Sequence, residues 1–266
     1  MSLVHGAEGD AGRLRRWSLY LFARYLEVPL LGASYQLLRG RYRGIGATWP
    51  VRALAVVLGA PFNYAGDTGR PVPAAEVLEM IDSLQGAMAV GPCRCRAAHH
   101  ACDHPLDTDL VIRAGVEAWT RAFPADYRRI EKKEAQEIVM ACSNVGMWQM
   151  VFVHCPLGEH DHAPAERPGR FHLGHEYVIC NCCTCGCVPY ILNREMGQRF
   201  FPLLHGEYVA WTHVDRCTGD GVCVEICPFG ARAVIDGCAA LVNPCFGCGL
   251  CAAACPHGAI QMRARR

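Results

Sequence analysis

The sequence predicts an α+β protein in three parts: a mostly helical N-terminal segment over residues 1–70, a Cys-rich domain over residues 71–205 and a small α+β domain over residues 206–266. Apolar residues recur with helical spacing in two segments between residues 73 and 147. Cysteines form tight groups from residue 93 onward. Near the C-terminus, two short apolar runs flank a glycine, which predicts a hairpin.

Composition restricts the classes of function. The chain has 266 residues, of which 52% are hydrophobic, so it can bury a sizeable core. Lys and Arg number 26 against 25 for Asp and Glu, which leaves a formal net charge of +1. Because such a balance gives no overall field that would attract nucleic acid, we expect no nucleic-acid partner.

Cysteine usage is the strongest compositional signal. The chain has 18 cysteines, which requires disulfides, metal binding or a redox role. Disulfides are typical of secreted proteins, but the N-terminus lacks the pattern of a signal peptide, and Arg24 interrupts the apolar run after Arg15-Arg16. Adjacent Cys182-Cys183 also cannot pair without strain. The sequence therefore predicts reduced cysteines in the cytoplasm.

The N-terminal segment has a mostly apolar run over residues 17–38 with arginines on both sides. The run is interrupted by Arg24, Glu27, Pro29 and Gly32. This pattern predicts two short helices packed on protein instead of a membrane span. An alternative, contact of residues 13–43 with a membrane surface or a partner subunit, rests on aromatic side chains beside arginines.

Two further helices are predicted from apolar periodicity. The first runs from Pro73 to about Leu84, and the second spans residues 131–147. Cys142 shares the apolar face of the second helix, so we interpret it as a small core residue and not as a ligand.

The clearest motif lies near the C-terminus and has the form C-x2-C-x2-C-x3-C-P. It consists of Cys245, Cys248, Cys251 and Cys255, followed by Pro256. The spacing resembles that of bacterial-type two-cluster ferredoxins. The resemblance implies a ferredoxin-like α+β fold in which the first three thiolates bind one cuboidal cluster and the fourth ligates the other.

The preceding motif repeats this pattern with one substitution. Cys217, Cys223 and Cys227-Pro228 match the template, but Asp220 stands at the second cysteine position. The resemblance implies that cluster I is held by Cys217, Cys223 and Cys255, with Asp220 as a candidate fourth ligand. Cluster II, a [4Fe-4S] cluster, takes Cys227, Cys245, Cys248 and Cys251.

Asp220 leaves two alternatives open for cluster I. A carboxylate is a harder ligand than a thiolate, so the site is expected to hold either a [3Fe-4S] cluster or a [4Fe-4S] cluster with one exchangeable, oxygen-ligated iron. In the first case Asp220 faces solvent and the iron is lost. Between the two motifs, residues 233–242 predict a hairpin in which Cys238 matches no ligand position.

Eight more cysteines form two dense groups upstream. They are Cys93, Cys95 and Cys102 in the first group, and Cys180, Cys182, Cys183, Cys185 and Cys187 in the second. Thiolates this dense repel one another unless a soft cation or cluster binds them. Eight ligands would serve two further cuboidal clusters or one larger cluster, and Arg94 and Arg96 would donate hydrogen bonds toward sulfur.

The order C-x-C-R, then I-C-N-C-C-x-C-C-C, then a ferredoxin module resembles uncharacterised bacterial and archaeal iron–sulfur proteins over residues 71–266. This sequence departs from the pattern at Gly186, where a cysteine is expected, so the number of upstream clusters stays open. Zinc is the alternative occupant, because histidines lie close in sequence at positions 99, 100, 104, 172 and 175. Three others, at 154, 160 and 162, are predicted in a solvated loop.

Three hypotheses for function follow. No phosphate-binding loop or dinucleotide fingerprint occurs in the sequence, and it assigns no catalytic residue. The favoured hypothesis is an electron-transfer protein that relays single electrons to or from a partner oxidoreductase. The second is a reductase whose Cys-rich domain holds a substrate-binding cluster supplied by the ferredoxin module. The third is a zinc-binding or metal-sensing protein.

Overall fold

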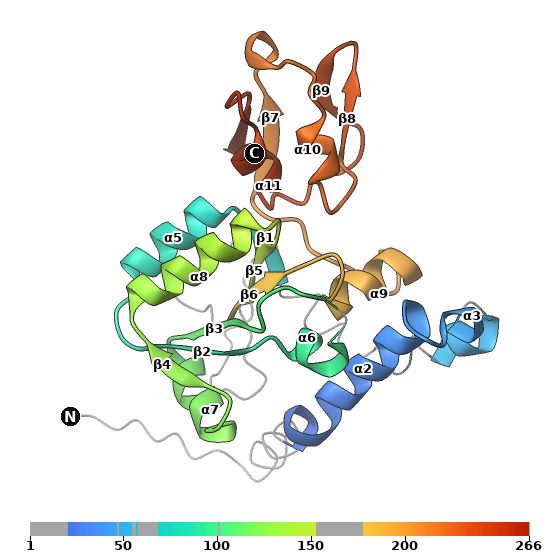
Figure 1. Cartoon of the computed structure of the whole chain (residues 1–266), viewed down its shortest axis with the longest axis vertical. Helices are drawn as coiled ribbons and strands as arrows, with labels where there is room; N and C mark the ends of the chain where they lie inside the picture. The colour runs from blue at the N-terminus through green and yellow to red at the C-terminus, as the bar shows by residue number, and fades with distance from the viewer. Residues whose placement is uncertain are drawn as a thin grey trace.

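The computed structural model describes residues 21–46, 48–54, 57, 69–100, 102–152 and 178–265. Helices and strands both occur, as the sequence predicts for an α+β protein (Figure 1). The described cysteines are free thiols, in agreement with the rejection of a disulfide framework.

From residue 21 to residue 38 the N-terminal segment forms one continuous helix, where a break was predicted. A π-helical turn, η1 (Phe22–Leu26), leads directly into α2 (Glu27–Leu38), followed by the short α3 (Arg43–Gly46). The prediction of a break at Pro29 and Gly32 was wrong. Pro29 lies in the first turn of α2, and the wider π turn before it accommodates the missing N–H.

Gly32 and Glu27 dock this helix on the Cys-rich region. A Cβ at Gly32 would lie 2.9 Å from the carbonyl oxygen of Ala98 in α6 (Arg94–His99), so glycine allows the two helices to approach closely. The Glu27 carboxylate also pairs with Arg94 Nε at 3.1 Å. None of the helices within the described ranges is long and apolar enough to cross a membrane.

A six-stranded sheet forms the centre of the molecule. Its strands are β1 (Gly69–Val72), β2 (Met88–Pro92), β3 (Asp107–Ile112), β4 (Arg128–Ile130), β5 (Trp148–Phe152) and β6 (Val178–Cys182). They lie in the order β1-β5-β6-β3-β2-β4, and all five neighbouring pairs are antiparallel.

Alternate residues of the sheet bury opposite faces. Val90 and Leu110 pack with α5 (Ala74–Ser83) and α8 (Lys132–Asn144), whereas Ala89 and Val111 pack with α7 (Ala114–Ala122). The predicted helices over 73–84 and 131–147 are thereby confirmed as α5 and α8. Cys142 is 1% exposed in α8, which confirms that it is a core residue.

The C-terminal part consists of two strand pairs and short helices. β7 (Tyr208–Thr212) pairs with β10 (Ile260–Ala264), and β8 (Arg232–Ile235) pairs with β9 (Cys238–Leu241). η2 (Val214–Arg216), α10 (Val222–Glu225) and α11 (Leu250–Ala254) complete it. The predicted hairpin is confirmed, and Asp236 and Gly237 at its turn both have positive φ, as a tight hairpin requires.

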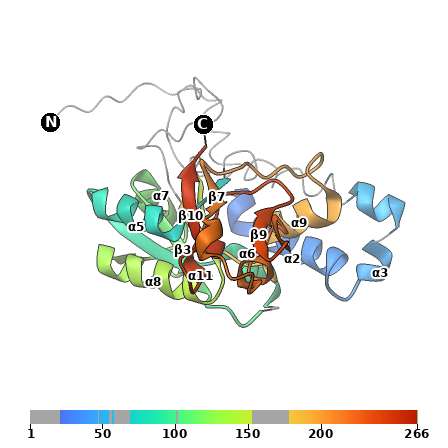
Figure 2. The same cartoon turned by 90° about the horizontal axis from the view of Figure 1, so that it is seen from above.

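The C-terminal part lies beyond one end of the six-stranded sheet (Figure 1). Seen from above, α5, α7 and α8 lie to one side of it, and α2, α3 and α9 (Val188–Met196) lie to the other (Figure 2). Glycines with positive φ precede both of its short helices, at Gly221 before α10 and Gly249 before α11. The backbone before α10 therefore repeats the conformation of the backbone before α11.

Candidate metal centres

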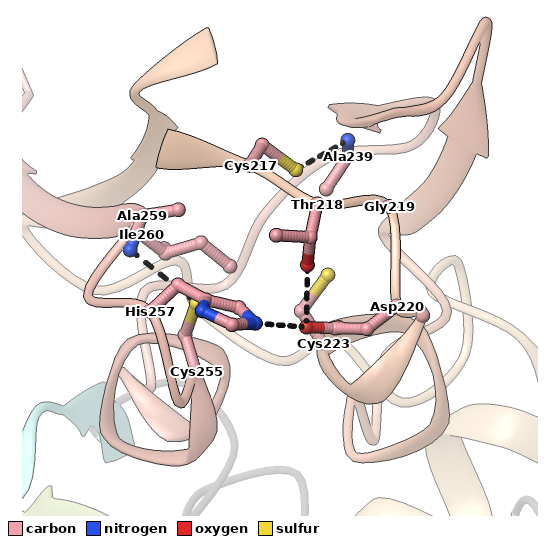
Figure 3. A pocket seen from close by; sticks show the side chains of 11 residues that line it. Cys217, Thr218, Gly219, Asp220, Cys223, Ala239, Cys255, His257, Ala259 and Ile260 are labelled. Carbon is pink, nitrogen blue, oxygen red and sulfur yellow. Dashed lines mark hydrogen bonds and ion pairs between the residues drawn. The ribbon is translucent and has the colours of Figure 1, made fainter. Parts of the chain in front are cut away.

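The first motif and the last cysteine converge on one cavity. Its wall includes the side chains of Cys217, Cys223, Cys255 and Asp220 (Figure 3). Cys217 follows η2, Cys223 lies in α10, and Cys255 follows α11. These are the residues expected for cluster I, and their role as ligands stays a prediction.

Backbone N–H groups stabilise negative charge on two of these sulfurs. Ala239 N donates to Cys217 Sγ and Ala259 N donates to Cys255 Sγ, both at 3.3 Å (Figure 3). The N–H groups of Ala239 and Gly219 lower the pKa of the Cys217 thiol. Donors of this kind favour the thiolate, which is the form that binds iron.

Asp220 lies at the rim of the same cavity. Its Oδ1 accepts the Val222 N–H at 3.0 Å, and its Oδ2 accepts the Thr218 hydroxyl at 3.2 Å. His257 Nε2 lies 3.6 Å from the same Oδ2, and the Asp220 side chain is 33% exposed (Figure 3). The carboxylate is therefore both part of the cavity wall and accessible to solvent.

The remaining four cysteines of the C-terminal part surround a second cavity. Its lining includes Cys227, Cys245, Cys248 and Cys251. The seven cysteines are therefore divided between the two cavities as the crossed ligation pattern predicts. Burial raises the pKa of Cys248 and raises the pKa of Cys251 to about 12. Ligands with such raised pKa values lose their protons when a metal centre binds, so loading this cavity would release protons.

Arg232 is a residue of this second cavity that the sequence did not single out. It lies on β8, is 3% exposed, and donates from Nη2 to the Thr212 hydroxyl at 2.5 Å. Within the described part of the chain, its buried Nε and Nη1 atoms have no hydrogen-bond partner. Unpartnered cationic donors beside four thiols fit an anionic cluster in the cavity.

We expect Arg232→Gln to lower the reduction potential of cluster II. A unit positive charge a few ångströms away, at an effective dielectric constant of about 20, favours the reduced state by about 2–4 kcal/mol. For a one-electron couple this corresponds to roughly 100 mV. A redox titration followed by paramagnetic resonance measures the shift, with Arg232→Lys as the charge-retaining control. Equal potentials in Arg232→Gln and the wild type would contradict the electrostatic role.

The eight upstream cysteines do not form two sets of four. Four of them, here called the four-cysteine set, form a row of neighbouring thiols in which Cys93 contacts Cys95, Cys95 contacts Cys187 and Cys187 contacts Cys182. The neighbouring Cys95 thiol and burial raise the pKa of Cys93, and the Cys187 thiol raises that of Cys95. Cys187 lowers the pKa of Cys182, but burial and nearby thiols raise it to about 12.

Three other cysteines lie around a histidine. Cys102, His104, Cys183 and Cys185, here called the cysteine–histidine set, have ligand atoms within 4.8 Å of one another. Cys102 Sγ lies 3.9 Å from Cys183 Sγ, and Cys185 Sγ lies 3.2 Å from His104 Nδ1. The sequence placed His104 only among several neighbouring histidines, and the fold assigns it to this set.

Cys180 is hydrogen-bonded to a carboxyl group. Its thiol donates to Asp109 Oδ1 at 3.2 Å, and the Tyr127 hydroxyl donates to Asp109 Oδ2 at 2.6 Å. The expected eight ligands therefore comprise the four-cysteine set, three cysteines beside His104, and Cys180, which is bonded to Asp109 and packs on the same core as Cys95, Cys182 and Cys187. Cys187 N donates to the Cys183 carbonyl at 3.1 Å, which closes a turn over residues 183–187.

Arg96 lies between the two upstream sets. It is 3% exposed, its Nη1 donates to the Asn181 carbonyl at 2.9 Å, and the same atom lies 3.8 Å from Cys183 Sγ. Burial lowers the pKa of Arg96, but the Cys93 and Cys183 thiols raise it by a larger amount, so its pKa is above the ordinary value. The expectation that Arg96 donates toward sulfur is met, whereas Arg94 pairs with Glu27 and lies over the Phe123 ring.

One apolar core connects the second cavity to the four-cysteine set. It contains Cys182 and Cys187 together with Cys248, and Cys95 and Cys227 pack against it. Aromatic rings fill the space between them. Trp148 contacts Tyr190 and Phe229 with ring centroids 5.1 and 5.5 Å apart, and Phe229 stacks on Phe246 at 4.3 Å.

This aromatic bridge, Trp148–Tyr190–Phe229–Phe246, reaches both sites. Phe229 and Phe246 line the second cavity, and Trp148 on β5 is the register partner of Cys182 on β6. The second cavity and the four-cysteine set are therefore separated by packed side chains.

Several candidate ligands considered from the sequence lie outside the described residues. They are His154, His160, His162, His172 and His175, all between residues 153 and 177.

Comparison with known proteins identifies the C-terminal part. A family model described as a 4Fe-4S binding domain matches residues 210–233 and 243–261. These ranges contain all seven cysteines that line the two cavities. Neither a comparison with curated proteins nor one with solved structures yields a match. The C-terminal residues 210–261 are thus a ferredoxin-type iron–sulfur domain that binds a [4Fe-4S] cluster.

Proposed function

We propose that this protein is an iron–sulfur electron-transfer protein that relays single electrons between its C-terminal domain and the four-cysteine set, and to or from a partner oxidoreductase. The observation that carries the proposal is the shared apolar core. Two cysteines assigned to cluster II, Cys227 and Cys248, and three of the four-cysteine set pack in it or against it. Bound iron–sulfur clusters supply one-electron redox chemistry.

The residues of the chain have distinct roles in this proposal. The C-terminal domain is of the two-cluster type, with cluster II on Cys227, Cys245, Cys248 and Cys251. Cluster I uses Cys217, Cys223 and Cys255, and is either a three-iron cluster or a four-iron cluster with Asp220 as the fourth ligand. Four thiolates at Cys93, Cys95, Cys182 and Cys187 hold one further cluster. The aromatic bridge excludes water between this cluster and cluster II, while Arg96 and Arg232 offset negative charge.

A reductase is the second candidate, and one observation favours it. Asp109 is 5% exposed, burial raises its pKa, and it is hydrogen-bonded by Tyr127 and Cys180. The Cys180 thiol in turn lies close enough to Cys93 and Cys95 for their charges to raise its pKa further. A protonatable group of this kind beside the four-cysteine set is what a reductase needs for proton delivery. In both cases we place the protein in the reducing cytoplasm, where thiol ligands stay reduced.

Iron analysis of the full chain tests the relay. We expect anaerobically purified protein to contain about twelve irons, or about eleven with a three-iron cluster I. Cys187→Ser should lower the count by about four, because it removes a ligand of the upstream cluster. Cys142→Ala, which changes a buried cysteine outside the proposed ligands, is the matched control.

Two outcomes would contradict the relay. One is an iron count that is the same in Cys187→Ser and the wild type. The other is an upstream paramagnetic signal whose reduction does not respond when the C-terminal domain is reduced.

A further inference from the structure

We propose that Cys102, His104, Cys183 and Cys185 bind a single zinc ion, separate from the iron–sulfur sites. Zinc in structural sites is four-coordinate and tetrahedral, and three cysteines with one histidine are among its usual ligand sets. With Zn–S of about 2.3 Å and Zn–N of about 2.0 Å, a tetrahedral ion holds its sulfurs about 3.8 Å apart and a sulfur and a nitrogen about 3.5 Å apart. The observed separations are 3.9 Å for Cys102–Cys183 and 3.2 Å for Cys185–His104.

The compactness of the set favours one ion over a cuboidal cluster. A cluster places its own iron and sulfide atoms between the cysteines, and so spreads their sulfurs farther than a single ion does. Here all four ligand atoms lie within 4.8 Å of one another.

The surroundings fit the charge of such a site. Three thiolates and one Zn²⁺ carry a net charge of −1, and the buried Arg96, whose Nη1 lies 3.8 Å from Cys183 Sγ, supplies the opposite charge. Cys183 is 1% exposed, whereas Cys102, His104 and Cys185 are half-buried. A zinc ion could therefore reach the site from solvent, past the half-buried ligands, and bind to the buried Cys183 thiolate.

Gly186 packs closely against the cysteine–histidine set. A Cβ at this position would lie 3.0 Å from Arg96 Cγ and 3.2 Å from Cys102 Sγ, so a side chain here would crowd the Cys102 ligand. Glycine therefore leaves room for the ligands, and the fourth donor, His104, comes from the loop after α6.

The zinc ion would join two loops that flank the four-cysteine set. Cys102 and His104 follow α6, which carries Cys95, while Cys183 and Cys185 lie between Cys182 and Cys187. Binding energy at such a site contributes directly to folding. Its role is thus structural: it fixes the two loops relative to each other.

Metal analysis of the anaerobically purified full chain tests the proposal. We expect about one zinc per chain in the wild type, and less than about a tenth of that in His104→Ala and Cys185→Ser. His104→Cys should retain zinc, because a set of four cysteines also binds zinc tetrahedrally. Cys142→Ala, in the same apolar cluster as Cys183, should retain it too. Iron content should be equal in all of these proteins.

Cobalt(II) provides a second measurement, made on the wild type and on the one variant that is expected to keep the site. After chelation of zinc, the wild type and His104→Cys should both bind one Co²⁺ and show thiolate-to-cobalt absorption, with different band positions because one nitrogen ligand is replaced by sulfur. Wild-type protein without zinc, or iron that is lost with His104→Ala, would overturn the proposal. An iron count limited to the C-terminal domain would refute the relay while leaving the zinc count unchanged, so the two proposals fail separately.

Discussion

Asp220→Cys is expected to convert cluster I into a site with four thiolate ligands. The Asp220 carboxylate lies at the rim of a cavity lined by Cys217, Cys223 and Cys255, so a thiol at this position completes the ferredoxin pattern. A three-iron paramagnetic signal of the oxidised protein should disappear, and the iron count should rise by about one. If cluster I instead has an Asp-ligated iron, that iron should stop exchanging with added thiols or chelators, because thiolate is the softer ligand.

Asp215→Cys is the matched control for this change. It adds a thiol to the same domain at an exposed position in η2, outside the wall of the cavity, and should change neither signal nor iron count. Asp220→Cys also loses the acceptor of the Val222 N–H, which should cost only about 1 kcal/mol of stability. An Asp220→Cys protein with the wild-type spectrum and iron count would refute the assignment of Asp220 to cluster I.

Trp148→Ala should cause the largest loss of stability. Trp148 is fully buried and packs against both Tyr190 and Phe229, so truncation leaves a cavity between the sheet and the C-terminal domain. Such substitutions cost about 3–5 kcal/mol. In a chain of this size we expect the melting temperature of the anaerobically loaded protein to fall by about 10 °C.

Two variants bracket this prediction. Trp148→Phe keeps most of the ring contacts and should lose much less stability. Trp49→Ala, at a position that is 81% exposed, should change stability by no more than about 0.5 kcal/mol. A melting temperature for Trp148→Ala equal to that of Trp49→Ala would show that the aromatic bridge does not hold the two parts together.

The sequence predicted well the features that depend on local patterns. The cysteine spacing located the C-terminal domain, apolar periodicity located α5 and α8, and the Asp236-Gly237 turn located the hairpin. The six-stranded sheet was not predicted. Its strands are short, and the central ones are buried on both faces. Val90 and Ala89, which point to opposite faces of β2, are therefore both apolar, and no alternation is visible.

The division of the upstream cysteines could not be read from the sequence either. Cys102 and Cys183 are separated by 81 residues, and their contact depends on the pairing of β3 with β6. The close spacing of the cysteines along the chain predicted that their thiols bind soft metals together, but it could not show which thiols lie beside one another. Arg232 and Asp109 were missed for a related reason: their roles come from burial beside thiols that are distant in sequence.

The contact between the C-terminal domain and the sheet also has a consequence for the proposed relay. At Gly206 the backbone passes so near the Pro71 carbonyl that a Cβ would lie 2.0 Å from the oxygen, and a Cβ at Gly249 would lie 2.8 Å from that of Pro73. Such close packing leaves the domain no room to move as a tethered shuttle between donor and acceptor. In the proposed relay, the fold would therefore set the distance from cluster II to the four-cysteine set, and a redox partner would have to bind to a surface that does not move.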